Sequence, residues 1–118
     1  MTPREAMAAL GAACAEHSRV YDLVEAARRT LAGTLASDSD AVVVPRIQAV
    51  EDARAVEMDA YAAACGAHRT AFRAYTESGP PGAALLLLKL VSADMYAVDV
   101  SAIESAIAAM FAPPAVTT

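Results

Sequence analysis

Hydrophobic residues recur along the first third of the chain in alternating steps of three and four, the spacing of one face of a paired α-helix. Thr2 and Glu5 form a capping box ahead of this pattern, with Pro3 at the first helical position. We therefore predict a helix over residues 3–35. The positions of this first seam are Met7, Leu10, Cys14, His17, Tyr21, Val24, Arg28, Leu31 and Leu35.

A second seam with the same period predicts a helix over residues 45–77. Pro45 fits the first turn of such a helix, and Gly79 with the prolines after it ends the pattern. The polar residues 37–40 form the loop that joins the two predicted helices. The positions of the second seam are Val44, Ile47, Glu51, Arg54, Met58, Tyr61, Cys65, His68, Phe72 and Tyr75.

Two shorter helices complete a single all-α domain over residues 1–118. Residues 83–92 are apolar on all sides, which is typical of a short buried helix. Ser101 and Glu104 form a second capping box, which opens a helix over residues 101–112. The pattern thus predicts a long antiparallel helical hairpin plus two short C-terminal helices. Each long helix spans about 50 Å, so the short helices cannot cover both, and we predict a homodimeric bundle.

Composition supports the helical class and excludes some partners. Alanine, the best helix former, makes up about a quarter of the chain. The net charge is −5 and Lys89 is the only lysine, so no basic stripe is present to bind nucleic acid or an anionic membrane. Neither a signal peptide nor an apolar run of membrane-spanning length is found. We expect a cytoplasmic protein whose thiols stay reduced.

All cysteines and histidines fall in two Cys-x-x-His pairs, Cys14 with His17 and Cys65 with His68. In an antiparallel hairpin the two pairs come level with each other, so they could form a Cys₂His₂ metal site, a disulfide or plain seam packing. The spacing is unfamiliar for zinc, and cytosolic thiols are reduced. We therefore expect no metal, no other cofactor and no Cys14–Cys65 bond.

Charged residues in the middle of the seams suggest either an ion pair that fixes helix register or a ligand groove. The antiparallel register places Arg28 beside Glu51 and Asp52, and a charge at such a position is costly unless it is paired. In the groove interpretation, Glu51 belongs to a polar lining with candidate substrate-binding residues. These are Tyr21, Arg28, Arg54 and Tyr61.

Two stretches give the chain a family resemblance: residues 7–35 with Glu16-His17-Ser18-Arg19, and residues 47–75 with Glu51-Asp52-Ala53-Arg54. In overall profile, short, acidic, alanine-rich and helical, the chain resembles the lysinoalanine-forming proteins of duramycin- and cinnamycin-type lanthipeptide biosynthesis. The resemblance assigns no family residue to a numbered position. It implies a protein of antibiotic biosynthesis that adds a lysine amine to a dehydroalanine within one modified peptide.

That reaction needs a base, because only a neutral amine attacks, and the candidate catalytic residues are His17, His68 and Glu51. The protein could otherwise act mainly by holding the reactive peptide conformation. Two alternatives remain open at this level: a non-catalytic helical interaction or scaffold protein, and a metal-binding bundle that uses the two Cys-x-x-His pairs.

Overall fold

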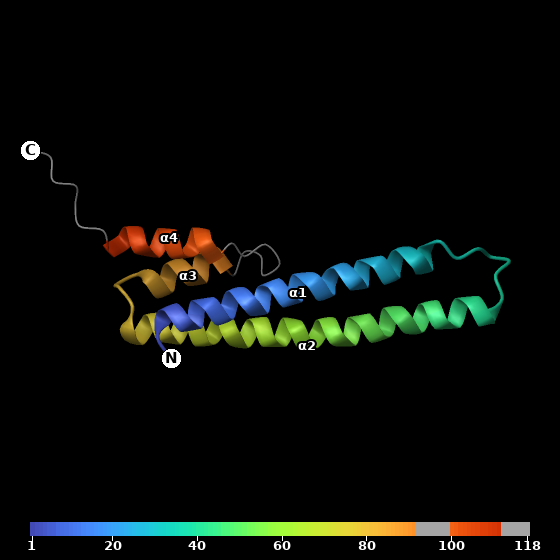
Figure 1. Ribbon diagram of the computed structural model, residues 1–118, viewed down its shortest axis with the longest axis horizontal. Helices are drawn as coiled ribbons and strands as arrows, with labels where there is room; N and C mark the ends of the chain where they lie inside the picture. The colour runs from blue at the N-terminus through green and yellow to red at the C-terminus, as the bar shows by residue number, and fades with distance from the viewer. Residues whose placement is uncertain (92–99, 112–118) are drawn as a thin grey trace, which may run out of the picture.

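The computed structural model of the protein describes residues 1–91 and 100–111 and is all-helical over that part. Its helices are α1 (Pro3–Ala32), α2 (Asp40–Ser78), α3 (Ala83–Val91) and α4 (Val100–Phe111). The helices α1 and α2 run antiparallel as a long hairpin, and α3 and α4 lie against the end of the hairpin that holds the N-terminus (Figure 1). The predicted helical class and the long hairpin with two short helices are confirmed.

The two long helices begin at polar caps. The Thr2 hydroxyl accepts a hydrogen bond from the Glu5 backbone N–H at 3.1 Å, as the capping box predicts. At α2 the helix begins at Asp40, five residues before the predicted start, because the Ser39 carbonyl accepts the N–H groups of Val42 and Val43. Pro45 therefore lies inside α2, close to its first turn.

The helix ends are set by local hydrogen bonds. α1 ends at Ala32, short of the predicted Leu35, because the Asp38 carboxylate accepts the Leu35 backbone N–H at 2.7 Å and holds a turn there. Gly82, with φ of 83°, adopts the left-handed conformation open to glycine. Its carbonyl accepts the Leu86 N–H at 3.0 Å, and the chain turns back into α3.

The hydrophobic core lies at the end of the hairpin that α3 and α4 cover. Leu10 of α1, Ala71 of α2, Leu87 of α3 and Ile107 of α4 belong to one buried cluster. In the first seam the structure buries the predicted residues from Met7 to Val24, apart from half-buried Tyr21, whereas Arg28 and Leu35 are exposed. Beyond the core, α1 and α2 continue as a two-helix ribbon. The overall dimensions of the molecule are 76 × 30 × 17 Å.

The second seam is displaced by one residue from its predicted position, and this is the main correction to the sequence prediction. The buried residues of α2 include Ala64, Ala71 and Ala74, and its less exposed positions continue the same seven-residue period back through Glu57 and Val50. Small alanine side chains let two helix axes approach closely, which large side chains would prevent. Five large residues of the predicted seam are exposed instead: Val44, Ile47, Met58, Tyr61 and Phe72.

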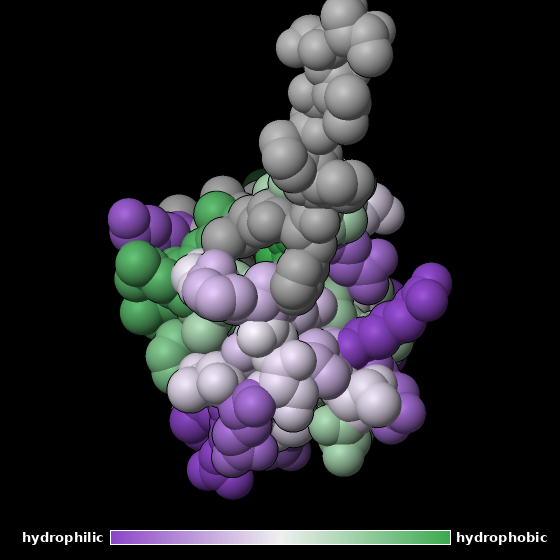
Figure 2. All heavy atoms as spheres, turned by 90° about the vertical axis from the view of Figure 1, so that its left-hand side faces the viewer, coloured by the Kyte–Doolittle hydropathy of each residue, from purple (hydrophilic) through white to green (hydrophobic). Residues whose placement is uncertain are grey.

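The shape is elongated for a chain of this length. The radius of gyration is 20.0 Å, against about 13 Å for a compact globule of 100 residues. Hydrophobic side chains gather on one flank of the end of the molecule that holds the N-terminus (Figure 2). On α3, Leu85 and Leu88 are exposed. Over the described residues, none of the helices has the length and apolar character required to cross a membrane.

Candidate functional site

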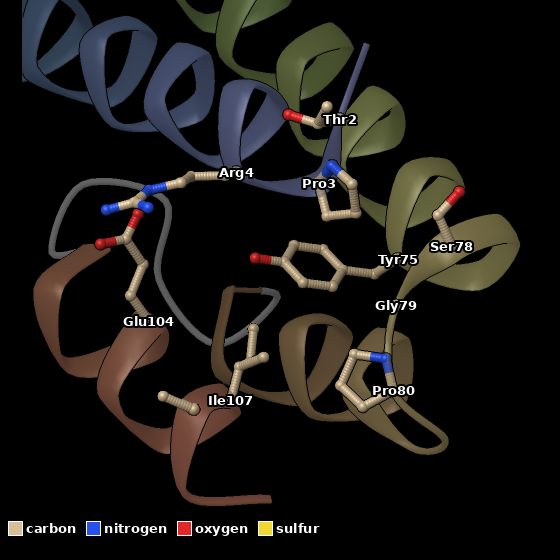
Figure 3. A pocket seen from close by; sticks show the side chains of 10 residues that line it. Thr2, Pro3, Arg4, Tyr75, Ser78, Gly79, Pro80, Glu104 and Ile107 are labelled. Carbon is tan, nitrogen blue, oxygen red and sulfur yellow. The ribbon is translucent and has the colours of Figure 1, made fainter. Parts of the chain in front are cut away.

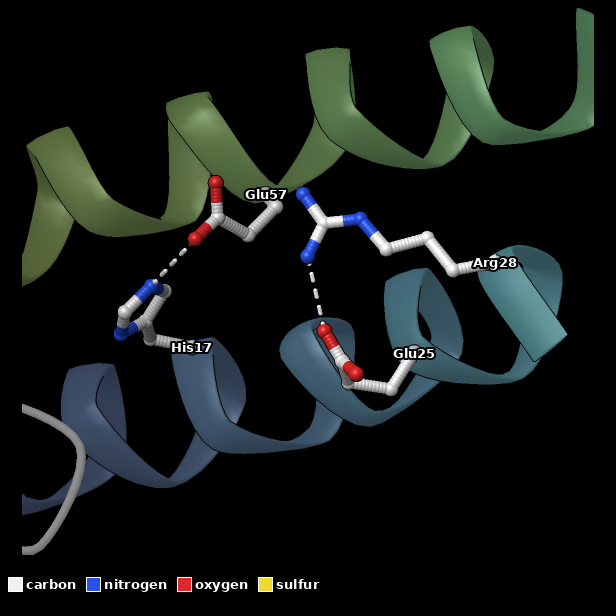
Figure 4. A network of polar contacts seen from close by, with 4 residues as sticks. All are labelled: His17, Glu25, Arg28 and Glu57. Atoms are coloured by element: carbon white, nitrogen blue, oxygen red, sulfur yellow. Dashed lines mark hydrogen bonds and ion pairs between the residues drawn. The ribbon is translucent and has the colours of Figure 1, made fainter. Parts of the chain in front are cut away.

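A histidine–glutamate pair joins the two long helices in the middle of the hairpin (Figure 4). His17 of α1 is completely buried, and its Nε2 lies 3.2 Å from Oε1 of Glu57 on α2. The Glu57 side chain is 19% exposed, so the carboxylate reaches solvent while the imidazole does not. The pair therefore places a hydrogen-bonded carboxylate at the edge of the helix interface.

Tyr61 and Cys65 extend this pair along α2. Glu57, Tyr61 and Cys65 are four residues apart in succession, so their side chains follow one face of the helix. The Tyr61 ring lies against the His17 imidazole, with centroids 5.2 Å apart and an interplanar angle of 59°. A side-chain hydrogen bond with Cys65 raises the pKa of the Tyr61 hydroxyl. We call Cys14, His17, Glu57, Tyr61 and Cys65 the mid-hairpin cluster.

The two cysteines of the mid-hairpin cluster are free thiols. Burial raises the pKa of Cys14, and the nearby Cys65 raises it further. Only the thiolate is nucleophilic, and reactive cysteines have lowered pKa values. The environment of Cys14 thus favours the inert, protonated thiol, which agrees with a packing role.

His68 lies apart from the cluster, in a pocket of about 420 Å³ that Arg69, Phe72, Arg73 and Leu88 also line. Burial lowers the pKa of His68, and the positive charge of Arg69 lowers it further. Its Nε2 is buried and has no hydrogen-bond partner within the described residues. This histidine is therefore held neutral beside two arginines, and it does not meet His17.

The Cys-x-x-His residues do not converge as a Cys₂His₂ metal site requires. Across residues 1–91 and 100–111, no three His, Cys, Asp or Glu side chains are grouped so that they could hold a metal ion. His17 instead bonds Glu57, and His68 belongs to the separate pocket. This geometry does not support the metal-binding alternative.

Arg28 also pairs with a different residue from the one that the sequence predicts. The Arg28 guanidinium donates a hydrogen bond to Glu25 at 2.8 Å on its own helix, rather than pairing with Glu51 or Asp52 across the hairpin (Figure 4). The Arg28–Glu25 pair is exposed, so it contributes little to stability.

The other predicted site residues do not form one lining either. Glu51 and Arg54 are exposed on the outer side of α2, while Tyr21 is half-buried on α1. Among the predicted site residues, the structure brings His17 and Tyr61 into contact.

Glu57 is the site residue that the sequence pattern missed. It lies one position before Met58, in the seven-residue series that faces α1. Reading the second seam one residue earlier would have placed this carboxylate opposite the first helix.

The chain matches no protein-family model, no curated protein and no solved structure.

Proposed function

We propose that this protein is a non-catalytic helical interaction protein that associates as a homodimer through the outer face of α2. The observation that carries the proposal is the exposure of large apolar side chains in a regular seven-residue series. Met58 is 65% exposed and Val44 is 59% exposed, although both are large apolar residues of a long helix. We define the outer stripe as Val44, Ile47, Glu51, Arg54, Met58, Tyr61 and Phe72.

The outer stripe has the period of a helix contact. From Val44 to Tyr61 its positions alternate in steps of three and four, the spacing that keeps one face of a helix against a partner helix, and Phe72 lies on the same face eleven residues further on. The alanine-rich series that contacts α1 runs beside it, one residue earlier in the sequence. A helix with two adjacent series of this kind is suited to a bundle in which it contacts two neighbours. A second copy of the chain supplies such a neighbour with the same length and period.

Charge complementarity favours an antiparallel arrangement of the two α2 helices. In an antiparallel pair, a register that sets Glu51 opposite Arg54 of the second copy forms two ion pairs by symmetry. The same register sets Ile47 opposite Met58, and Val44 opposite Tyr61. The two charged residues of the outer stripe therefore pair with each other, and its apolar residues from Val44 to Tyr61 meet apolar residues, whereas Phe72 lies beyond the overlap of the two α2 helices.

Charge reversal in the outer stripe tests this register. We expect the wild-type protein to sediment with twice the 12.2 kDa mass of the chain at micromolar concentration. Glu51→Arg and Arg54→Glu should each weaken the dimer at least tenfold, which corresponds to about 1.4 kcal/mol. Each single change sets like charges opposite each other, whereas the double variant E51R/R54E restores opposite charges and should restore dimer affinity.

The matched control is Asp22→Arg, which reverses an exposed charge on α1 outside the outer stripe. It should leave the dissociation constant of the dimer unchanged. A monomeric wild-type protein at micromolar concentration would contradict the proposed homodimer. A double variant as weak as the single variants would contradict the register.

The mid-hairpin cluster favours a second candidate function, the lysinoalanine-forming activity that the family resemblance implies. The observation behind it is the His17–Glu57 pair, whose carboxylate reaches solvent beside exposed Tyr61. In this proposal Glu57, positioned by His17, accepts a proton as the lysine nitrogen bonds to the β-carbon of dehydroalanine. The α-carbon then gains a proton, so the addition needs no oxidant or reductant.

Glu57→Gln tests this activity on a synthetic peptide with one lysine and one dehydroalanine. Glutamine keeps the size of the side chain but removes its basicity, so we expect cross-linking to fall at least tenfold, measured by mass spectrometry after hydrolysis. The control Glu25→Gln changes a carboxylate on α1 outside the cluster and should retain activity. Wild-type protein that does not accelerate cross-linking would exclude this candidate and leave the interaction function standing.

A further inference from the structure

A pocket of about 430 Å³ lies at the end of the molecule that holds the N-terminus (Figure 3), and its lining includes no residue of the mid-hairpin cluster or the outer stripe. Three separate segments form it: the start of α1, the C-terminal end of α2 with the turn that follows, and α4. Its apolar wall includes Pro3, Pro80 and Ile107, together with the ring of Tyr75. Pockets of this size and lining are typical of small-molecule sites.

Tyr75 directs a polar group into this pocket. The residue is only 8% exposed, and its hydroxyl points to the space between Arg4 and Glu104 (Figure 3). Within the described residues, no hydrogen bond is formed by this hydroxyl. Burial raises the pKa of Tyr75, and the nearby Glu104 carboxylate raises it further, so the phenol keeps its proton and can donate. Because this hydroxyl has no hydrogen-bond partner among the described residues, it is available to donate to a ligand in the pocket.

Opposite charges stand at the mouth of the pocket. The side chains of Arg4 and Glu104 point toward each other from α1 and α4 (Figure 3). Neither side chain forms an ion pair within the part of the chain that the structure describes. The pocket thus offers one cationic and one anionic group, with a phenolic donor between them and an apolar wall below.

We propose that this pocket binds a zwitterionic α-amino acid with an apolar side chain. The guanidinium of Arg4 binds the ligand carboxylate, a pairing that arginine makes with two parallel hydrogen bonds. The Glu104 carboxylate binds the ammonium group, and the Tyr75 hydroxyl donates to the ligand carboxylate. The apolar side chain packs against Ile107 and Pro80. A ligand with only one of the two charges would leave the opposite protein charge unmatched.

The ligand would also connect segments that the sequence keeps far apart. Arg4, Tyr75 and Glu104 belong to α1, α2 and α4 respectively. A ligand that contacts all three and binds only the folded state should raise the melting temperature, and the rise should grow with the logarithm of ligand concentration above the dissociation constant. The effect should not depend on whether the protein is a monomer or a dimer, because the outer stripe is not part of this pocket.

Calorimetric titration of the full-length protein with L-leucine and L-phenylalanine tests the proposal. We expect one site per chain with a dissociation constant below about 1 mM, and a rise in melting temperature with each ligand. Phenylethylamine lacks the carboxylate and 3-phenylpropionate lacks the amine, so each should bind at least tenfold more weakly than L-phenylalanine. Equal binding of either analogue would overturn the zwitterion assignment, and no binding of either amino acid would overturn the site.

Three variants test whether the ligand binds in this pocket. Arg4→Gln and Glu104→Gln each remove one charge from an exposed side chain, so folding should be retained while binding falls at least tenfold. Tyr75→Phe keeps the ring and removes the hydroxyl, and we expect binding to fall severalfold. The control Glu77→Gln removes a nearby exposed charge outside the pocket and should bind as wild type. Binding unchanged in Arg4→Gln and Glu104→Gln would place the ligand elsewhere and refute the proposal.

Discussion

Replacing Leu87 by alanine is expected to lower the free energy of unfolding by about 2–5 kcal/mol. Leu87 is fully buried on α3 and belongs to the same cluster as Leu10 of α1 and Ile107 of α4. Truncation removes buried methyl groups and leaves a cavity where the short helices meet the hairpin. Urea denaturation at a fixed protein concentration measures the change, because association also contributes to apparent stability.

The control for this variant is Leu85→Ala, which removes the same atoms from a residue 54% exposed on the same helix. We expect its effect to stay within about 0.5 kcal/mol. Equal losses in the two variants would show that α3 does not pack through Leu87. A small loss at both positions would show that α3 contributes little to the fold.

Replacing Ala64 by leucine is expected to destabilise the hairpin by about 1–3 kcal/mol. Ala64 has no exposed surface and lies in the alanine-rich series of α2 that faces α1. The larger side chain has to push the helix axes apart or adopt a strained rotamer, because the interface is closely packed. The same urea experiment measures the loss.

Ala62→Leu is the matched control, because Ala62 is an exposed residue of the same helix. Leucine and alanine have similar helix propensities, so this change should be close to neutral. A stabilising effect of Ala64→Leu would mean that α2 presents a different face to α1. The outer stripe would then have to be reassigned, together with the homodimer built on it.

The helices themselves were predictable because their signals are local. Thr2 caps α1 as expected, and the glycine and proline residues after Ser78 mark the end of α2. The misjudged boundaries were those on either side of the connecting loop, which hydrogen bonds within the loop decide. Asp38 ends the first helix early through a bond to the Leu35 backbone, and sequence periodicity carries no information about that contact.

The face of α2 could not be predicted from period alone. The series through Met58 and the series through Glu57 have the same spacing, and they differ only in which side chains they contain. Preference for large apolar residues selects the Met58 series, whereas close packing of the helices selects alanine. That choice of face placed Glu51 at the interface and left Glu57 unnoticed. A comparison of side-chain volumes across both predicted helices would be needed to decide between the two.

The pocket at the N-terminal end of the molecule could not be predicted from the sequence, for a different reason. Its polar groups come from Arg4, Tyr75 and Glu104, which no spacing rule connects. They meet because α4 returns to the end of the hairpin where α1 begins. Such a site depends on tertiary arrangement, and it becomes visible only when the four helices are placed together.

Burial along the hairpin is uneven, which makes its two halves different in local stability. Within the long helices, the buried residues of α1 end at Val24 and those of α2 begin at Ala64. In the loop-side half, few buried side chains shield the backbone hydrogen bonds from solvent. We therefore expect the free energy of local unfolding there to be smaller than the free energy of global unfolding. Amide hydrogen exchange should therefore proceed inward from the loop. A partner that binds the loop-side half would therefore stabilise that half without changing the half that packs against α3 and α4.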